Sequence, residues 1–79
     1  MTWAEYRRVR EVDLKGRRGR VLRRVCNKAG HVLNEGALVT IRGKANGLEL
    51  ETEPCEHCKQ SMIVRGIDPN DVEVGPRHG

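Results

Sequence analysis

The stretch that decides the fold is residues 37–53, ALVTIRGKANGLELETE. In its first half Val39 and Ile41 alternate with polar side chains, and from Leu48 onward leucine alternates with glutamate. Strict alternation of apolar and polar residues is the period of a half-buried β-strand. The Ala-Asn-Gly sequence between the two halves tolerates positive φ, as a tight hairpin turn requires. The stretch therefore predicts a β-hairpin with one face in the core.

The same two-residue period extends, more weakly, to both sides of this hairpin. Residues 21–26 form a β-branched run with interleaved arginines, for which we expect a strand with a bulge near Arg23 and Arg24. A polar loop should follow it. Residues 62–65 should pair with the second hairpin strand, and residues 72–74 should form a last short strand after a tight or 3₁₀ turn. The chain is therefore expected to be mainly β, with five strands.

The N-terminal segment predicts one short helix before the strands. Thr2 and Glu5 have the spacing of a capping box, and apolar residues then recur every three positions, so the helix should run to about Val12. Residues 16–20 contain two glycines and three arginines and should form an exposed, mobile turn. The only large rings are Trp3 and Tyr6. Two interpretations stay open: they cover one end of the core, or they anchor a partner.

The order of these elements, with a long first loop, two tight hairpins and a turn just before the last strand, resembles the SH3-like barrel. This family includes KOW-type domains and small prophage-encoded barrels. Residues 34–41, NEGALVTI, are similar to the glycine-led second strand of such barrels, and residues 67–74, IDPNDVEV, to the helical turn into their last strand. Small barrels that stand alone are often accessory or regulatory proteins of bacteria and their phages. The resemblance covers about residues 20–74 and implies a helical arm at 1–15, a five-stranded SH3-like barrel at 16–75 and a flexible tail at 76–79.

Charge is distributed unevenly along the chain. The sequence has 15 Lys and Arg against 11 Asp and Glu, a formal net charge of +4, and the excess lies in the first 28 residues. Such a concentration attracts phosphate backbones or an acidic protein surface, and it is also typical of a solubilising arm. We expect contacts with nucleic acid, or with an acidic partner, through the arginines of this segment: Arg7, Arg8, Arg10, Arg17, Arg18, Arg20, Arg23 and Arg24.

The scarcity of rings limits the kind of partner. Phe is absent, and both large rings precede the strands. The expected barrel therefore has no platform on which bases stack and no groove for proline-rich peptides. Contacts with nucleic acid should be made mainly to its backbone, with little sequence selectivity. Arg42 and Lys44 should lie beside the glutamates of residues 49–53, with Lys59 and Arg65 beyond them, so the outer face of these strands should be charge-balanced.

Cys55 and Cys58 have the two-residue separation of half a zinc site. The missing ligands would be His57 and His78, or the same cysteines of a second copy of the chain. Without metal, the pair is a reduced turn whose sulfurs are partly packed. A redox role is weaker, because the activated form of this motif opens a helix, whereas here it joins strands. Cys26 is expected to be a small buried hydrophobe.

The sequence favours a non-enzymatic binding module. Its histidines are scattered, its carboxylates alternate along exposed strand positions, and it has no glycine-rich phosphate loop. It has no run long enough for a transmembrane helix and no signal-peptide region after Met1. We therefore expect a cytoplasmic protein with no membrane partner, as a monomer or a small homo-oligomer.

Overall fold

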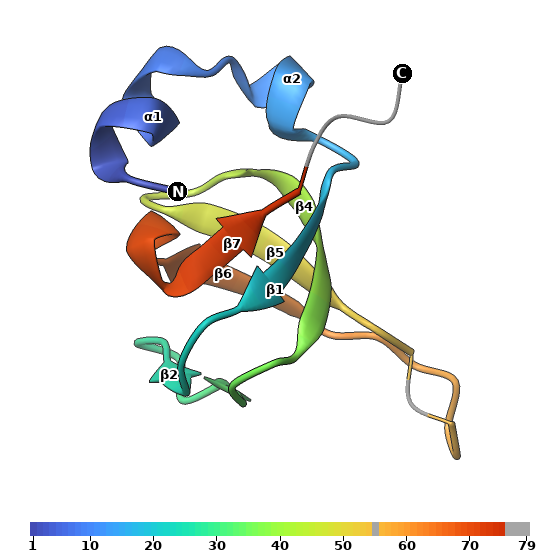
Figure 1. The fold of residues 1–79 in the computed structure, drawn as a ribbon. Coiled ribbons are helices and arrows are strands. Elements are labelled where there is room, and N and C mark those ends of the chain that lie inside the picture. The colour runs from blue at the N-terminus through green and yellow to red at the C-terminus, as the bar shows by residue number, and fades with distance from the viewer. Residues whose placement is uncertain (55, 76–79) are drawn as a thin grey trace.

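The predicted hairpin forms the middle of a five-stranded antiparallel sheet (Figure 1). The computed structural model describes residues 1–54 and 56–75, so the expected tail at 76–79 lies outside the described residues. The strand order in the sheet is β6-β5-β4-β1-β7, and the protein is mainly β, as predicted, with short helical structure before the strands. The elements in chain order are α1 (Trp3–Arg8), α2 (Glu11–Leu14), β1 (Arg18–Val21), β2 (Val25–Cys26), β3 (Val32–Leu33), β4 (Leu38–Lys44), β5 (Leu48–Thr52), β6 (Ile63–Ile67), η1 (Pro69–Asp71) and β7 (Val72–Val74).

β1 shows that the expectation of an exposed, mobile turn at residues 16–20 is wrong for residues 18–20, although Gly16 does lie in an exposed turn. This strand lies inside the sheet, between β4 and β7, and its Gly19 is buried. A Cβ atom at Gly19 would lie 3.1 Å from the Val72 Cγ1 atom and 3.2 Å from the Glu73 carbonyl oxygen. The glycine is therefore a close-packing residue of a strand. The arginines beside it do not repel the strand from the sheet, because they alternate with buried residues and point to the outer face.

The expected strand at residues 21–26 is broken in two. β1 ends at Val21, and the chain bends where a bulge at Arg23 and Arg24 was expected. The bend is held by Leu22, whose N–H donates to the carbonyl oxygen of Asp71 at 2.8 Å. The chain leaves the main sheet at this point and returns to it only at β4.

β2, the last part of the expected strand, pairs in a separate two-stranded sheet with β3, which lies in the segment expected to be a polar loop. Leu33 of β3 is buried and belongs to the core. Cys26 of β2 is exposed, so the prediction that it is a buried hydrophobe is wrong. A two-residue strand is too short for its pattern to show which side chain faces inward.

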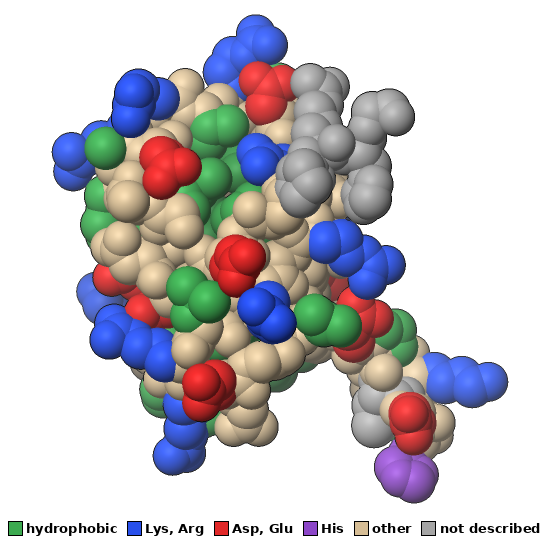
Figure 2. Space-filling model, viewed as in Figure 1, with side chains coloured by type: hydrophobic (Ala, Val, Ile, Leu, Met, Phe, Trp, Pro, Cys, Tyr) green, Lys and Arg blue, Asp and Glu red, His purple; other side chains and the backbone are tan. Residues whose placement is uncertain are grey.

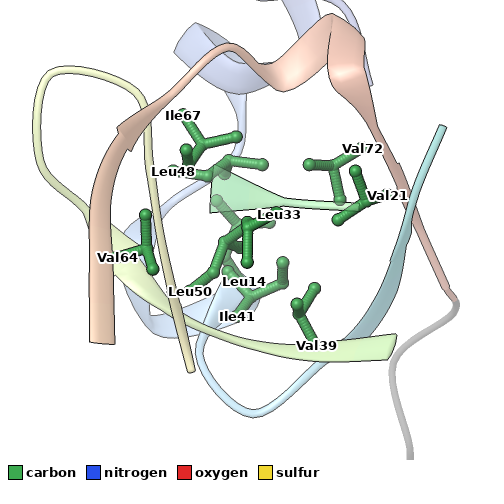
Figure 3. Close-up of a cluster of buried hydrophobic side chains, with 10 residues drawn as sticks. All are labelled: Leu14, Val21, Leu33, Val39, Ile41, Leu48, Leu50, Val64, Ile67 and Val72. Atoms are coloured by element: carbon green, nitrogen blue, oxygen red, sulfur yellow. The ribbon is translucent and has the colours of Figure 1, made fainter. Parts of the chain in front are cut away.

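Ten buried aliphatic side chains form the core (Figure 3). Eight come from the main sheet, and the other two come from α2 and β3, so segments on both sides of the sheet complete the core. Each fully buried Leu, Ile or Val contributes about 1.5–3 kcal/mol. The ten residues are Leu14, Val21, Leu33, Val39, Ile41, Leu48, Leu50, Val64, Ile67 and Val72.

Two helices, instead of one through Val12, cover one end of the sheet (Figure 1). α1 begins at the predicted capping box, in which the Thr2 hydroxyl accepts from the Glu5 N–H at 3.1 Å. Val9 and Arg10 then adopt extended backbone, which ends α1 and lets α2 begin in a new direction. The three-residue apolar period was a sound signal for the helix but carried no information on this break.

The helices are attached to the turn between β4 and β5. The Lys44 ammonium donates to the carbonyl oxygen of Val9 and lies 4.7 Å from the centre of the Tyr6 ring. The Lys44 N–H donates to the Glu11 carboxylate at 3.1 Å, and the Gly47 N–H donates to the Tyr6 hydroxyl at 3.1 Å. Side chains of both helices are therefore bonded to one short turn.

The hairpin between β5 and β6 continues beyond the sheet as a projecting finger, residues 53–62 (Figure 1). All of its described residues are exposed. The finger therefore adds nothing to the core and is available for contacts.

Leu14 tests whether the helices belong to the cooperative fold. Leu14→Ala should lower the free energy of unfolding by about 2–5 kcal/mol, because it removes a fully buried side chain and leaves a cavity. Val12→Ala is the matched control in the same helix, because Val12 is 65% exposed, and it should change that free energy by less than about 0.5 kcal/mol. Urea unfolding followed by circular dichroism measures both. Equal stability of the two variants would show that α2 is not part of the core.

Candidate functional site

The outer face of β4, β5 and β6 carries the charge balance that the sequence predicted. Arg42 pairs with Glu51, and Arg65 pairs with Glu49, each at 3.0 Å between nitrogen and oxygen. Lys44 was expected in the same row but reaches α1 instead. These are exposed pairs worth about 0–1 kcal/mol each, so their main effect is on local charge.

β1 extends this row of ion pairs to the edge of the sheet. Arg18 pairs with Glu53 at 2.9 Å, and Arg20 pairs with Glu73 of β7 at 3.3 Å. With the pairs of the neighbouring strands, four arginines face four glutamates on one surface. The outer face of the sheet is therefore a poor track for a phosphate backbone, although Arg18 and Arg20 were predicted binding residues.

Four more of the eight predicted arginines also have partners. Two of these partners are carboxylates, and the others are backbone carbonyls, that of Ala4 for Arg8 among them. Arg10 pairs with Asp13 at 3.2 Å, Arg23 pairs with the buried Asp71, and the Nε–H of Arg17 donates to the Gly75 carbonyl at 2.8 Å.

The cations without an ion pair in residues 1–54 and 56–75 include three from the helical segment: Arg7, Arg8 and Lys15. We call these three residues the basic cap. All three are exposed, and the Nε–H of Arg8 donates to the Ala4 carbonyl at 3.4 Å. Figure 2 shows Lys and Arg side chains projecting along the edge formed by the helices. The predicted set omitted Lys15, whose only signal was its place in the basic segment.

The acidic residues of the helical segment are occupied by structural contacts. Glu5 accepts from the backbone and the side chain of Thr2, at 3.2 Å in both cases. Glu11 accepts from the Lys44 N–H, and Asp13 pairs with Arg10. Glu5 and Glu11 accept from neutral groups, which do not cancel their negative charge, and Arg8 is among the charges that lower the pKa of Glu5, so these carboxylates partly offset the charge of the basic cap.

Hydrogen bonds lower the pKa of two exposed carboxyl groups. Thr2 lowers the pKa of Glu5 below its ordinary value of 4.5 through its backbone N–H and its hydroxyl. The hydroxyl of Ser61, and then the guanidinium of Arg42, lower the pKa of Glu51 in the same direction. Both groups are ionised at neutral pH, so the capping box and the Arg42 pair are intact there.

The other predicted arginine, Arg24, lies away from the basic cap. It precedes β2, at the opposite end of the sheet from the helices (Figure 1). Lys28 lies in the β2–β3 loop, and Lys59 lies on the finger; neither lysine, nor Arg24, forms an ion pair within the described chain. The structure thus divides the basic segment into a neutralised strand and two separate groups of free cations.

The two rings differ in their packing. Tyr6 packs against the buried core, which confirms that this ring covers one end of it. Trp3 meets Tyr6 edge to face, with 5.1 Å between ring centres and 80° between ring planes. Trp3 is half-buried, and it lies outside the set of residues packed on the core.

The predicted metal ligands lie only partly within the described residues. His57 and Cys58 are exposed on the finger, while Cys55 and His78 lie outside the described residues. Within residues 1–54 and 56–75, no three His, Cys, Asp or Glu residues are grouped to hold a metal ion. Lys59 follows Cys58 with a φ of 56°, the left-handed backbone for which metal knuckles usually use glycine. The zinc site stays a prediction.

Comparisons with protein-family models, with curated proteins and with solved structures found no match to this chain. No helix in the described part of the chain has the length and apolar character needed to cross a membrane. The function is therefore argued from the geometry of the described residues alone.

The lowered pKa of Glu51 predicts an acid-side loss of stability. A carboxyl group whose pKa is lower in the folded than in the unfolded chain stabilises the fold above its unfolded value, and this contribution is lost as pH falls through the folded value. Glu51→Gln should therefore lose less stability than the parent protein between neutral pH and pH about 3. Urea unfolding at both pH values measures this, with Glu35→Gln, which removes an exposed carboxylate outside the ion pairs, as control. Parallel losses in the parent and Glu51→Gln would contradict the prediction.

Proposed function

We propose that this protein is a small non-enzymatic module that binds nucleic acid through phosphate contacts with the basic cap. The observation that carries the proposal is the separation of paired from unpaired cations. Arg18 and Arg20 each have a carboxylate partner, whereas Arg7, Arg8 and Lys15 are exposed and have none among the described residues. An unpaired cation binds a phosphate and releases counterions without first breaking an ion pair. The cap therefore supplies the strongest attraction for phosphate.

We also propose that the sheet belongs to an SH3-like barrel. The support is the order β6-β5-β4-β1-β7, in which β4 and β5 form the central hairpin and β1 lies between β4 and the last strand. The long connection from β1 to β4 and the 3₁₀ turn directly before β7 also agree with that architecture. The small β2–β3 hairpin lies within the long connection.

Binding through the cap is a contact with phosphates and carries little sequence information. Arg7 and Arg8 occupy the last turn of α1, and Lys15 follows α2, so three long side chains project from one end of the protein. Within the described chain, the one hydrogen bond of these side chains runs from the Arg8 Nε–H to the Ala4 carbonyl, and it directs Arg8 toward its own helix and not toward a base edge. Contacts of this kind position nucleic acid without reading it. Their strength should fall steeply with ionic strength.

A second candidate is a protein-interaction module that binds an acidic protein surface and uses the finger. The supporting observation is that Met62 and Ile63 are 36% and 41% exposed where the finger meets β6. A structural zinc on Cys55 and Cys58, completed by His57 and His78 or by a second copy, belongs to this candidate. An apolar contact is far less sensitive to salt than a phosphate contact, and metal analysis of the purified protein tests the zinc.

Neutralising the basic cap tests the proposed function. The variant Arg7→Gln, Arg8→Gln, Lys15→Gln should bind a labelled DNA duplex at least about tenfold more weakly, because three phosphate contacts are lost. The slope of log affinity against log salt should become less steep by about 2–3. Fluorescence anisotropy at several salt concentrations measures both quantities.

The matched control is Arg18→Gln, Arg20→Gln, Arg42→Gln, which removes the same formal charge from cations that already have glutamate partners. It should retain most of the affinity. Equal losses in the two triple variants would show that net charge, not the cap, drives binding. Absence of binding to duplex or single-stranded DNA at low salt would reject the function and favour an acidic protein partner.

A further inference from the structure

Three hollows on the described surface differ in their charge. Two lie on the outer sheet face and include carboxylates in their lining, from Glu51 and Glu53 in one and from Glu73 in the other. The third, which we call the side hollow, has a volume of about 410 Å³. It is lined by residues 27–29, 45–46 and 65–66, which include two cations and no carboxylate. The side hollow is therefore the one of the three that suits an anion.

The walls of the side hollow are held in place without a ligand. The Asn27 carboxamide donates to the Arg65 carbonyl oxygen at 3.2 Å and accepts from the His31 N–H at 2.8 Å. This side chain fixes the β2–β3 loop against β6. The opposite wall is the tight β4–β5 turn, in which a Cβ atom at Gly47 would lie 2.7 Å from the Ile67 carbonyl oxygen. A preformed site loses little conformational freedom when a ligand binds.

The groups that line the side hollow combine positive charge with a small apolar surface. Lys28 is exposed and has no ion pair in the described chain. Arg65 uses its Nε–H for Glu49, at 3.0 Å, and its terminal nitrogens have no partner among the described residues. The methyl groups of Ala29 and Ala45 supply the apolar surface. Such a lining suits a ligand with an anionic end and a flat apolar body.

The side hollow is linked to α1 through the β4–β5 turn. Residues 45–46 form one of its walls, and the next residue, Gly47, donates its N–H to the Tyr6 hydroxyl at 3.1 Å. Tyr6 directly precedes Arg7 of the cap. A nucleic-acid strand that passes this turn would run from α1 toward the hollow. The volume lies within the range of about 300–1,000 Å³ in which small-molecule sites fall.

From these observations we infer that the side hollow holds one unpaired nucleotide of a single-stranded nucleic acid. Lys28 binds its phosphate, a terminal N–H of Arg65, whose Nε–H stays on Glu49, adds a hydrogen bond, and the base packs on Ala29 and Ala45. The inference rests on the proposed function, because the cap supplies the neighbouring phosphate contacts. It adds a preference for single strands, since a base inside a duplex is stacked and paired and cannot enter a hollow of this kind.

Lys28 gives the sharpest test. Lys28→Gln should weaken binding of the ten-nucleotide strand dT10 by about fivefold to tenfold, because a charge-assisted contact with phosphate is lost, and should leave binding of a DNA duplex unchanged. Lys59→Gln removes an equally exposed, unpaired lysine from the finger and should change neither affinity. Anisotropy with labelled dT10 and labelled duplex measures the affinities. Amide NMR shifts at Ala29, Asn46 and Gly66 should change with dT10.

The outcomes separate this inference from the proposed function. The protein could bind duplex and dT10 through the cap while the amides of Ala29 and Gly66 show no shift and Lys28→Gln has no effect. This outcome would overturn the inference and leave the proposed function standing. If the shifts of those amides give the same affinity for thymidine monophosphate as for dT10, the hollow binds a free nucleotide, and the single-strand assignment is overturned. Failure of the parent protein to bind dT10 or duplex would reject the proposed function itself.

Discussion

The pairing of β1 on both of its sides is the constraint on which the charge distribution depends. A strand hydrogen-bonded to β4 and β7 must alternate its side chains strictly, so Gly19 and Val21 face inward and Arg18 and Arg20 face outward. Two arginines on the outer face of a sheet repel each other unless carboxylates lie beside them. Glu53 and Glu73 occupy those places. Within the described chain, the arginines of β1 are therefore held in ion pairs, whereas Arg7 and Arg8 of α1 form none.

The helices that carry the proposed binding surface also contribute to the core. A sheet of this size buries few side chains, and the chain has no Phe to enlarge the core. Leu14 of α2 is fully buried, and Tyr6 of α1 packs on the same cluster. The helices therefore cannot be released without exposing apolar surface, at a cost of about 25 cal/mol per Å². A basic segment held in this way presents its cations at fixed places, unlike a solubilising arm.

Strand period and turn chemistry were sufficient to predict the β4–β5 hairpin, β6, β7 and the capping box, because these are local signals. The same signals failed at β1, since Gly19 is required by contact with Val72 and Glu73, which lie more than 50 residues away in sequence. They also failed to distinguish Arg7 from Arg18, because only the strand order shows which arginine lies beside a glutamate. The residues of the side hollow come from three separate segments and carry no common pattern.

Because the outer face of the sheet is charge-balanced, the positive potential of the protein is not spread evenly over its surface, as net charge alone would suggest. A polyanion is attracted by free cations and gains little from the ion-paired rows of the sheet, so the cap and the hollow are more favourable places for it than the outer face. The β4–β5 turn joins these two features, because Lys44 and Gly47 hold the helices and residues 45–46 line the hollow. Their spacing is therefore determined by one short, tightly packed turn. A fixed distance between the cap and the hollow favours a ligand whose phosphates and bases repeat at a matching interval. A nucleic-acid strand has such a repeat, whereas isolated anions do not.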